Sequence, residues 1–229
     1  GHAVVVRVQR PDIDLEPEWS GYETGIAKNF KEDFGEAAEW GKKVHAALDR
    51  YLRLGAELPS NMVQYASAAS KVALLAERLN MEAQTELALA VNQKLEPCDW
   101  KDWDNCWVRC ALDVCLIHPS LDYAVAIDWK TGKVKDDDRQ LALQAAMVFR
   151  HYPHVDTVLS GYCWLKEGGK IANAKFTRDK ERLLWKQYLP VARDLTDAVT
   201  HGEWPAKPSG LCREYCPVHS CKHNGRYRK

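Results

Sequence analysis

The segment YAVAIDWKTGK, residues 123–133, places an aspartate and a lysine at the end of a strongly apolar run. Runs of Val, Ala, Ile and aromatic residues of this length are typical of strands in the core of a domain. Burying Asp128 and Lys130 beside such a run is costly unless each charged group has a partner. The segment therefore constrains fold and function together, because one strand must serve both the core and a charged site.

A second apolar run, residues 106–117, precedes this segment, and the intervening tetrapeptide HPSL is a turn signal. We expect the two runs to form an antiparallel hairpin. If the turn is centred between the last two residues of the tetrapeptide, Asp113 lies directly opposite Asp128. Cross-strand neighbours on one face have Cβ atoms about 4.5–5.5 Å apart. The simplest hairpin thus pairs two carboxylates.

Two carboxylates this close repel each other unless a proton or a cation lies between them. Hard divalent cations such as Mg²⁺ bind oxygen ligands of this kind, and Mn²⁺ suits the same ligands. Lys130 shares the face of Asp128, because side chains alternate along a strand. Its ammonium could orient a water and stabilise charge at a phosphate, as metal-assisted phosphodiester hydrolysis requires. The alternative is a salt bridge on an exposed sheet face.

The rest of the chain predicts a sheet with helices beside it. The amphipathic segments 34–55 and 60–80 predict two helices, and residues 84–92 alternate as a strand does. Residues 136–153 predict a further helix; two more strands and a long helix at 178–200 follow. This order indicates an α/β (α+β) fold, with a central mixed β-sheet flanked by helices.

Length and charge set limits on the class of protein. A chain of 229 residues can bury one sizeable core, and we expect a domain at 1–205 followed by a Cys/His-rich basic tail at 206–229. With 32 basic and 32 acidic residues, any affinity for DNA must come from the local placement of charge. No apolar run is long enough to span a membrane, and the first residues lack a signal-peptide pattern. We therefore expect a cytoplasmic protein without a membrane partner.

The segment LDVCLIHPSLDYAVAIDWKTGK, followed by RQLALQ, resembles the core of the PD-(D/E)xK nuclease superfamily, specifically its RecB-type branch. The resemblance extends over about residues 35–225 and is most specific in DWKTG and the following QL. It implies a restriction-endonuclease-like core. It also implies that Asp113, Asp128 and the backbone carbonyl of Trp129 bind the metal, and that Lys130 is the catalytic lysine.

The resemblance extends to residues outside the hairpin. The segment GKKVHAALDRYL resembles the G-x-x-x-H helix of the branch, which implies that His45 lies near the metal; a packed core histidine is the alternative. Glu86 matches the early acidic residue of the family by position, as a catalytic carboxylate and metal ligand, or else faces solvent. Gln140 takes the place of the glutamine that touches DNA or the scissile phosphate. Where the branch often has tyrosine, this chain has Gln144, a candidate DNA contact.

The C-terminal segment LCREYCPVHSCKHNGRYRK concentrates three thiols and two imidazoles, the ligands of soft metals. It resembles the cysteine triplet of iron–sulfur-bearing RecB-type nucleases, but the far-upstream fourth cysteine of those proteins has no counterpart here. Zinc and the absence of any metal are the alternatives. The basic residues of the tail are candidate phosphate contacts, or an ordinary solvated tail, and Arg109 on the Asp113 face is a further candidate. The candidate ligands are Cys212, Cys216, Cys221 and His223.

Together these features predict a Mg²⁺-dependent deoxyribonuclease, with Mn²⁺ as the other candidate metal. A free-standing domain of this size, without helicase motifs, resembles phage or mobile-element exonucleases that resect duplex ends for recombination. That resemblance implies DNA and a single-strand annealing protein as partners, a location in the host cytoplasm, and room for a homo-oligomer. The alternatives are an endonuclease, a single-strand-specific CRISPR-associated-type nuclease, and a non-catalytic nucleic-acid-binding module.

Overall fold

The structure, a computed structural model, describes residues 5–6, 35–102, 104–134, 138–202, 208–214, 216, 218–219 and 221–227. The chain divides into two compact units, one containing Phe34–Leu189 and the other Pro190–Lys229. The division falls within helix α4 (Glu181–His201), at Pro190, which has no amide hydrogen to continue the helical hydrogen bonds. A domain boundary at residue 205 stays a prediction.

The helices and strands of the first unit follow the order that the sequence predicts. The sheet is mixed: β4 and β5 are parallel and joined through α3, whereas β2–β3, β3–β4 and β5–β6 are antiparallel. The strand order is β1-β3-β4-β5-β6, and β2 also pairs with β3. The elements are β1 (Val5–Val6), α1 (Gly35–Leu54), the 3₁₀ turn Ser60–Tyr65, α2 (Ala66–Leu79), β2 (Glu82–Val91), β3 (Val108–Ile117), β4 (Tyr123–Lys130), α3 (Arg139–His151), β5 (Thr157–Trp164) and β6 (Lys170–Thr177).

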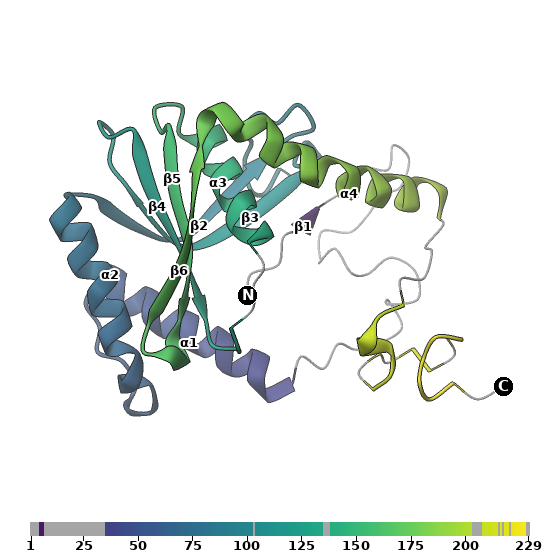
Figure 1. The fold of residues 1–229 in the computed structure, drawn as a ribbon, viewed down its shortest axis with the longest axis horizontal. Helices are drawn as coiled ribbons and strands as arrows, with labels where there is room; N and C mark the ends of the chain where they lie inside the picture. The colour runs from purple at the N-terminus through teal and green to yellow at the C-terminus, as the bar shows by residue number, and fades with distance from the viewer. Residues whose placement is uncertain are drawn as a thin grey trace. The chain divides into compact units, whose positions relative to one another are not determined.

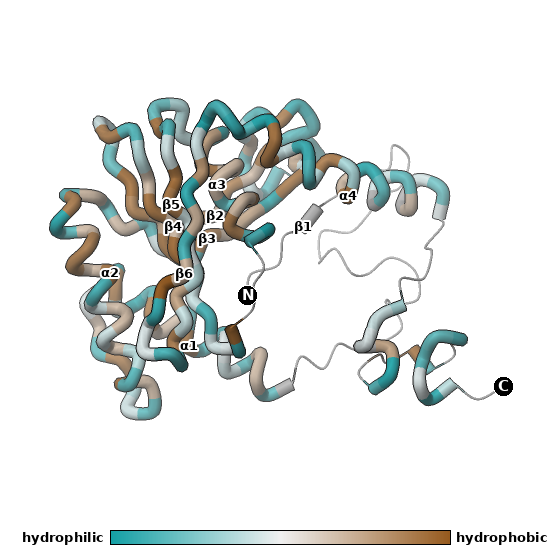
Figure 2. Tube along the Cα trace, viewed as in Figure 1, coloured by the Kyte–Doolittle hydropathy of each residue, from teal (hydrophilic) through white to brown (hydrophobic). Residues whose placement is uncertain are grey.

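Helices cover both faces of this sheet (Figure 1). Helices α1 and α2 pack on the face that carries alternate apolar residues of β3 and β4, among them Val114, Ile127 and Trp129. Helix α3 lies on the other face, where it contacts every strand from β2 to β6. Figure 2 shows hydrophobic residues gathered along the central strands, between these helices. Asp113 and Asp128 therefore lie on central strands of the sheet, and both residues are buried.

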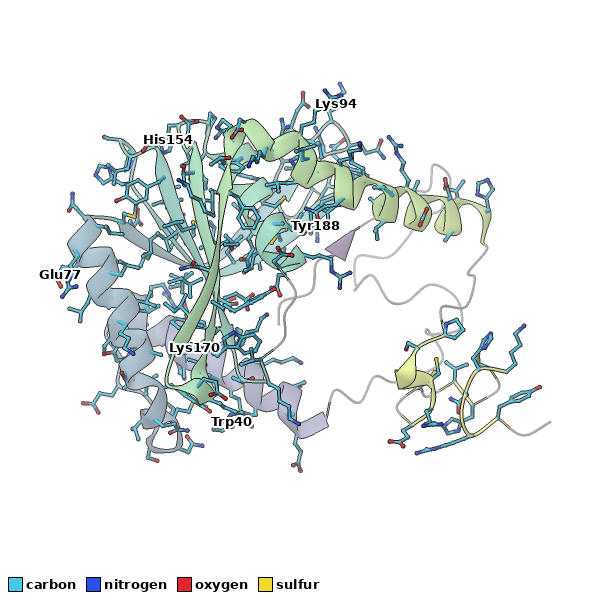
Figure 3. All side chains as sticks on the ribbon, in the orientation of Figure 1. Trp40, Glu77, Lys94, His154, Lys170 and Tyr188 are labelled. Carbon is cyan, nitrogen blue, oxygen red and sulfur yellow. The ribbon has the colours of Figure 1, made fainter. Side chains whose placement is uncertain are left out.

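Helix α3 lies within the predicted segment 136–153, of which residues 136–137 are outside the described residues. It begins at Arg139 and ends at His151, where Tyr152 takes φ −125° and ψ 84°. Pro153 accounts for this end, because proline disfavours the helical conformation in the residue before it. The Tyr188 hydroxyl, on α4, donates a hydrogen bond to the Arg139 carbonyl in the first turn of α3 (Tyr188 is labelled in Figure 3). No helix among the described residues is both long and apolar enough to cross a membrane.

The C-terminal end of α3 is held by a single guanidinium, that of Arg178. It donates hydrogen bonds to the carbonyls of Phe149 at 3.1 Å, Tyr152 at 2.8 Å and Val155 at 2.5 Å. Its carbon also lies 5.1 Å from the centroid of the Phe149 ring. The last carbonyls of a helix lack partners within the helix, so this side chain satisfies groups that would otherwise be left orphaned.

Replacing Arg178 with methionine is expected to lower the free energy of unfolding by about 2–3 kcal/mol, because several carbonyls lose a charged donor at once. The exposed Arg182, one turn along the chain, is the matched control, and its replacement with methionine should change stability by less than about 0.5 kcal/mol. Urea unfolding of both variants measures the difference. Equal stability of the two variants would mean that water replaces the hydrogen bonds of Arg178 without loss of stability.

Candidate active site

The acidic residues of the site lie in one row across three strands. The pair Val114–Ile127 sets the register of β3 and β4 and places Asp113 opposite Asp128, as the sequence predicts. In β2 and β3 the pairs on either side place Glu86 opposite Asp113. Opposed side chains in antiparallel strands point to the same face. The three carboxylates therefore come from neighbouring strands: Asp128 contacts the glutamines of α3, whereas Asp113 and Glu86 lie beside His45 of α1.

The ladder between β3 and β4 ends beside these residues. The last backbone pair is Val114–Ile127, although β4 continues to Lys130. The backbone N–H of Trp129 donates instead to Asp113 Oδ2, at 2.7 Å. Asp113 thus satisfies a strand amide with its side chain, and this bond fixes the position of its carboxylate within the sheet.

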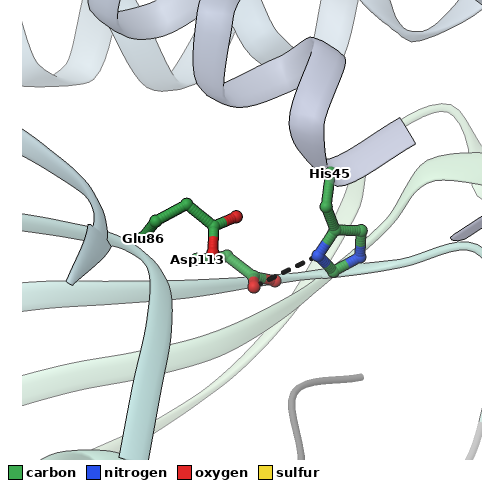
Figure 4. Close-up of side chains that lie close together, drawn as sticks. All are labelled: His45, Glu86 and Asp113. Atoms are coloured by element: carbon green, nitrogen blue, oxygen red, sulfur yellow. Dashed lines mark hydrogen bonds and ion pairs between the residues drawn. The ribbon is translucent and has the colours of Figure 1, made fainter. Parts of the chain in front are cut away.

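The second oxygen of Asp113 faces a histidine. His45 Nδ1, on α1, lies 3.2 Å from Asp113 Oδ1, and the His45 side chain is buried. One ligand atom each from His45, Glu86 and Asp113 lie within 4.8 Å of one another (Figure 4). Glu86 reaches this group with φ at +49°, a left-handed conformation that is uncommon outside glycine. Two of the sequence-predicted ligands, His45 and Glu86, thereby meet Asp113.

Helix α1 is tied to β2 next to this group. Thr85 Oγ1 donates a hydrogen bond of 2.5 Å to Asp49 Oδ1, one helical turn after His45. On the other side of His45, a Cβ added to Gly41 would lie 3.3 Å from Thr131 Oγ1. Glycine therefore lets α1 approach the end of β4 closely. These two contacts explain how a helix distant in sequence presents its histidine to the carboxylates.

Asp128 is enclosed by polar side chains and is only 1% exposed. Lys130 Nζ lies 2.5 Å from Asp128 Oδ2. Gln140 and Gln144, on α3, donate to Asp128 Oδ1 through their amide groups, at 2.5 and 3.3 Å. Lys130 also donates to Gln140 Oε1 at 2.9 Å and lies 4.8 Å from the centroid of the Tyr162 ring. Lysine, aspartate and glutamine thus form a closed set of contacts.

Electrostatics at Asp128 favour a bound cation. Burial raises the pKa of Asp128, and the negative charge of Asp113 raises this pKa further, whereas Lys130 and His45 oppose the shift. Within the described chain, the buried Asp128 Oδ2 accepts no hydrogen bond of good geometry, although it is ion-paired with Lys130. A positive charge placed between the two aspartates would relieve their repulsion.

The donor set fits a hard divalent cation. Carboxylate oxygens are the ligands that Mg²⁺ and Mn²⁺ prefer, and one imidazole is compatible with Mn²⁺. Of the described His, Cys, Asp and Glu side chains, only His45, Glu86 and Asp113 form a group of three with ligand atoms this close. Burial, followed by the charges of Asp128 and Asp113, raises the pKa of the nearby Cys110 thiol to about 12.

The other candidate residues lie in different settings. Arg109 is 3% exposed, with its Nε 3.1 Å from Cys106 Sγ and its guanidinium over the Trp100 ring. The guanidinium is thus packed inside the protein, and contact of Arg109 with a phosphate stays a prediction. Gln144 is fully buried against Asp128, which fits a positioning role better than contact with DNA. For Trp129, the bond found is that of its N–H, and metal binding by its carbonyl stays a prediction.

The tail cysteines are separate free thiols in the described part of the chain, each partly exposed. Their segment is folded back on itself: the Gly225 N–H donates to the Cys212 carbonyl at 3.0 Å, and Asn224 Nδ2 donates to the Cys216 carbonyl at 2.8 Å. A second metal site at Cys212, Cys216, Cys221 and His223 stays a prediction. Cys106, Cys110 and Cys115 are buried in the core.

Sequence reasoning missed two residues of strand β5. In the parallel register with β4, Tyr162 lies beside Asp128 and Ser160 beside Ala126, so both share the face of the site. Ser160 donates a hydrogen bond of 2.8 Å to Gln144 Oε1. The available signal was the polar group Ser-Gly-Tyr within an otherwise apolar strand.

Comparison with known proteins identifies the family of the chain. The sequence matches the family model described as "PD-(D/E)XK nuclease superfamily" over residues 19–221. No curated protein matches it significantly. A similar solved structure is described as that of a "putative exonuclease" from Eubacterium rectale; it has 16% sequence identity and a TM-score of 0.45, and the alignment covers 84% of this chain and 77% of that chain. Since the family model spans most of the sequence, the chain belongs to the PD-(D/E)XK nuclease superfamily.

Proposed function

We propose that this protein is a metal-dependent deoxyribonuclease that hydrolyses phosphodiester bonds with Mg²⁺ or Mn²⁺. The observation that carries the proposal is the row of Glu86, Asp113 and Asp128 on neighbouring strands, with Lys130 on the last carboxylate. A purely structural ion pair would need neither the other two carboxylates nor His45 at this position. Membership of a nuclease superfamily supports the same reading.

Each residue then has a defined task. Asp113, Asp128, Glu86 and His45 would hold the cation, which supplies Lewis-acid activation of the phosphate and of a water when it is bound. Lys130 would orient the attacking water and offset the charge that develops on the phosphate. Gln140 touches both Lys130 and Asp128, so it keeps the ammonium beside the carboxylate. The Lys130 ammonium lies over the face of the Tyr162 ring.

Among nucleases, we infer an exonuclease that resects duplex DNA ends. The support is the resemblance of the DWKTG and QL motifs to the RecB-type branch, in which free-standing phage and mobile-element enzymes of this size occur. In that setting the partners would be a single-strand annealing protein and further copies of the same chain, in the host cytoplasm. The complete set of Asp113, Asp128 and Lys130 speaks against a non-catalytic binding module.

Digestion of end-labelled DNA tests this proposal. With Mg²⁺, linear duplex DNA labelled at the 5′ or the 3′ end should be degraded progressively from one kind of end, while covalently closed circular DNA of the same sequence stays intact. Cleavage of the circle would indicate an endonuclease, and cleavage confined to single strands would indicate the single-strand-specific alternative. Binding of DNA without any cleavage, in Mg²⁺ and in Mn²⁺, would contradict the nuclease proposal.

A further inference from the structure

Ser160 lies on β5, away from the acidic row, yet its contacts lead to that row. Its side chain is fully buried on the face that α3 covers, and its hydroxyl donates to Gln144 Oε1 at 2.8 Å. Gln144 is also fully buried, and its Nε2 donates to Asp128 Oδ1 at 3.3 Å. A serine, a glutamine and an aspartate thus form a chain of hydrogen bonds that runs from β5 through α3 to β4.

The chemistry of these groups fixes the direction of every bond. Gln144 presents its NH₂ group to the Asp128 carboxylate, which is paired with Lys130 and accepts the hydrogen bond. Its amide oxygen is then left inside the protein and needs a donor, because an unsatisfied buried acceptor is costly. The Ser160 hydroxyl is that donor. An apolar residue at position 160 would remove the group that holds the amide in the orientation required by Asp128.

The orientation of the Asp128 carboxylate follows from the same contacts. Both Gln140 and Gln144 donate to Oδ1, whereas Oδ2 lies beside Lys130. Gln140 is only half-buried and its amide oxygen already accepts from Lys130, so it moves with the lysine. Gln144 is the partner that is anchored independently of Lys130, through Ser160. It therefore holds the carboxylate when the contacts of Lys130 change.

We propose that Ser160 is a positioning residue for metal binding: through Gln144 it holds Asp128 Oδ1 inside the protein, so that Oδ2, which is paired with Lys130 in the structure, turns to the cation when the ammonium moves aside. This inference rests on the proposed function, since it concerns the same cation. Outer partners of metal ligands set the orientation of the ligand, and their loss typically costs about 10–100-fold in metal affinity. The expected signature is weaker binding of metal by a protein that remains folded.

The first experiment compares two hydrogen-bonded serines, the buried Ser160 and the partly buried Ser70, by titration calorimetry with Mn²⁺ on the full chain. Ser160→Ala should weaken the affinity for Mn²⁺ about 10–100-fold. Ser70→Ala, the matched control, removes a hydrogen bond of 2.8 Å between Ser70 and Tyr51 that joins α2 to α1, and should leave the affinity unchanged. Ser160→Thr keeps the hydroxyl and should restore most of the affinity. Equal affinities of Ser160→Ala and wild type would overturn the proposal.

A double-variant cycle separates positioning from stability. Ser160→Ala alone leaves the amide oxygen of Gln144 unsatisfied, so its melting temperature should fall. Combining it with Gln144→Met removes that oxygen, and the melting temperature should recover in part, because replacing both partners by apolar groups is close to neutral. Affinity for Mn²⁺ should not recover. Recovery of affinity together with stability would assign Ser160 a structural role only.

The two proposals fail in different ways. A wild-type protein that binds no Mn²⁺ and cleaves no DNA would overturn the proposed function, and the role of Ser160 with it. A wild-type protein that binds Mn²⁺ and cleaves DNA, with Ser160→Ala behaving like Ser70→Ala in both assays, would overturn only the role of Ser160.

Discussion

Replacing Lys130 with alanine is expected to slow DNA cleavage by a factor of about 10²–10³ while DNA binding and the fold stay nearly intact. The ammonium lies 2.5 Å from Asp128 Oδ2 and donates to Gln140, so it sits where the attacking water and the phosphate would meet the metal. Interactions that strengthen in the transition state appear in the rate rather than in affinity for the substrate. Single-turnover cleavage of linear duplex DNA with Mg²⁺ measures the effect.

Lys133 provides the control, since it is an exposed lysine just beyond the same strand. Its replacement with alanine removes one positive charge but should leave the cleavage rate within a small factor of wild type. A binding assay with Ca²⁺ in place of Mg²⁺ shows whether either variant has lost DNA affinity. Cleavage at the wild-type rate by the Lys130 variant would return the lysine to the role of a salt-bridge partner, worth about 0–1 kcal/mol of stability.

The hairpin could be predicted because the residues that determine it are close together in the sequence. A turn signal between two apolar runs sets the register, and the register alone decides that Asp113 and Asp128 meet. Strand β4, Tyr123–Lys130, lies within the segment 123–133 from which the hairpin was predicted. His45 could be placed on a helix by its periodicity, but only the resemblance to a family pointed that helix toward the carboxylates.

The contacts from β5 and α3 could not be predicted in the same way. Strands β4 and β5 are parallel and joined by a crossover through α3, and no local pattern sets the register of such a pair. The neighbours Asp128–Tyr162 and the chain that begins at Ser160 depend on that register. The burial of Arg109 could not be predicted for a similar reason. Alternation along β3 shows which residues share a face of the sheet, but not what covers that face.

The site also shows why a charged row can be kept within an apolar sheet. Each of the two buried aspartates has neutral or positive partners: Asp113 has the Trp129 amide and His45, and Asp128 has Lys130 and two glutamines. These partners do not remove the repulsion between the two aspartates, since Asp113 still raises the pKa of Asp128. The remaining repulsion makes binding of a cation favourable.

Asp113→Asn is therefore expected to produce a protein that melts at a higher temperature without metal and is inactive with it. Asparagine can still accept from the Trp129 N–H with its oxygen and face His45 with its amide, so the local hydrogen bonds survive while one of two repelling charges is lost. In the wild type, metal at 100 times its Kd should add about 2.7 kcal/mol to the free energy of unfolding. In the variant this gain should largely vanish.

Asp122→Asn, at an exposed position before β4, controls for the loss of a negative charge and should keep both the metal response and cleavage. Thermal melts with and without Mn²⁺, beside cleavage of linear duplex DNA, measure all three proteins. Asp113→Asn could instead be less stable than wild type without metal and be stabilised by Mn²⁺ as much as wild type is. In that case Asp113 makes structural hydrogen bonds in the sheet, and the cation binds elsewhere. A more stable variant that no longer responds to Mn²⁺ places the cation at the carboxylate row, because removal of one charge then relieves the repulsion that the metal would otherwise neutralise.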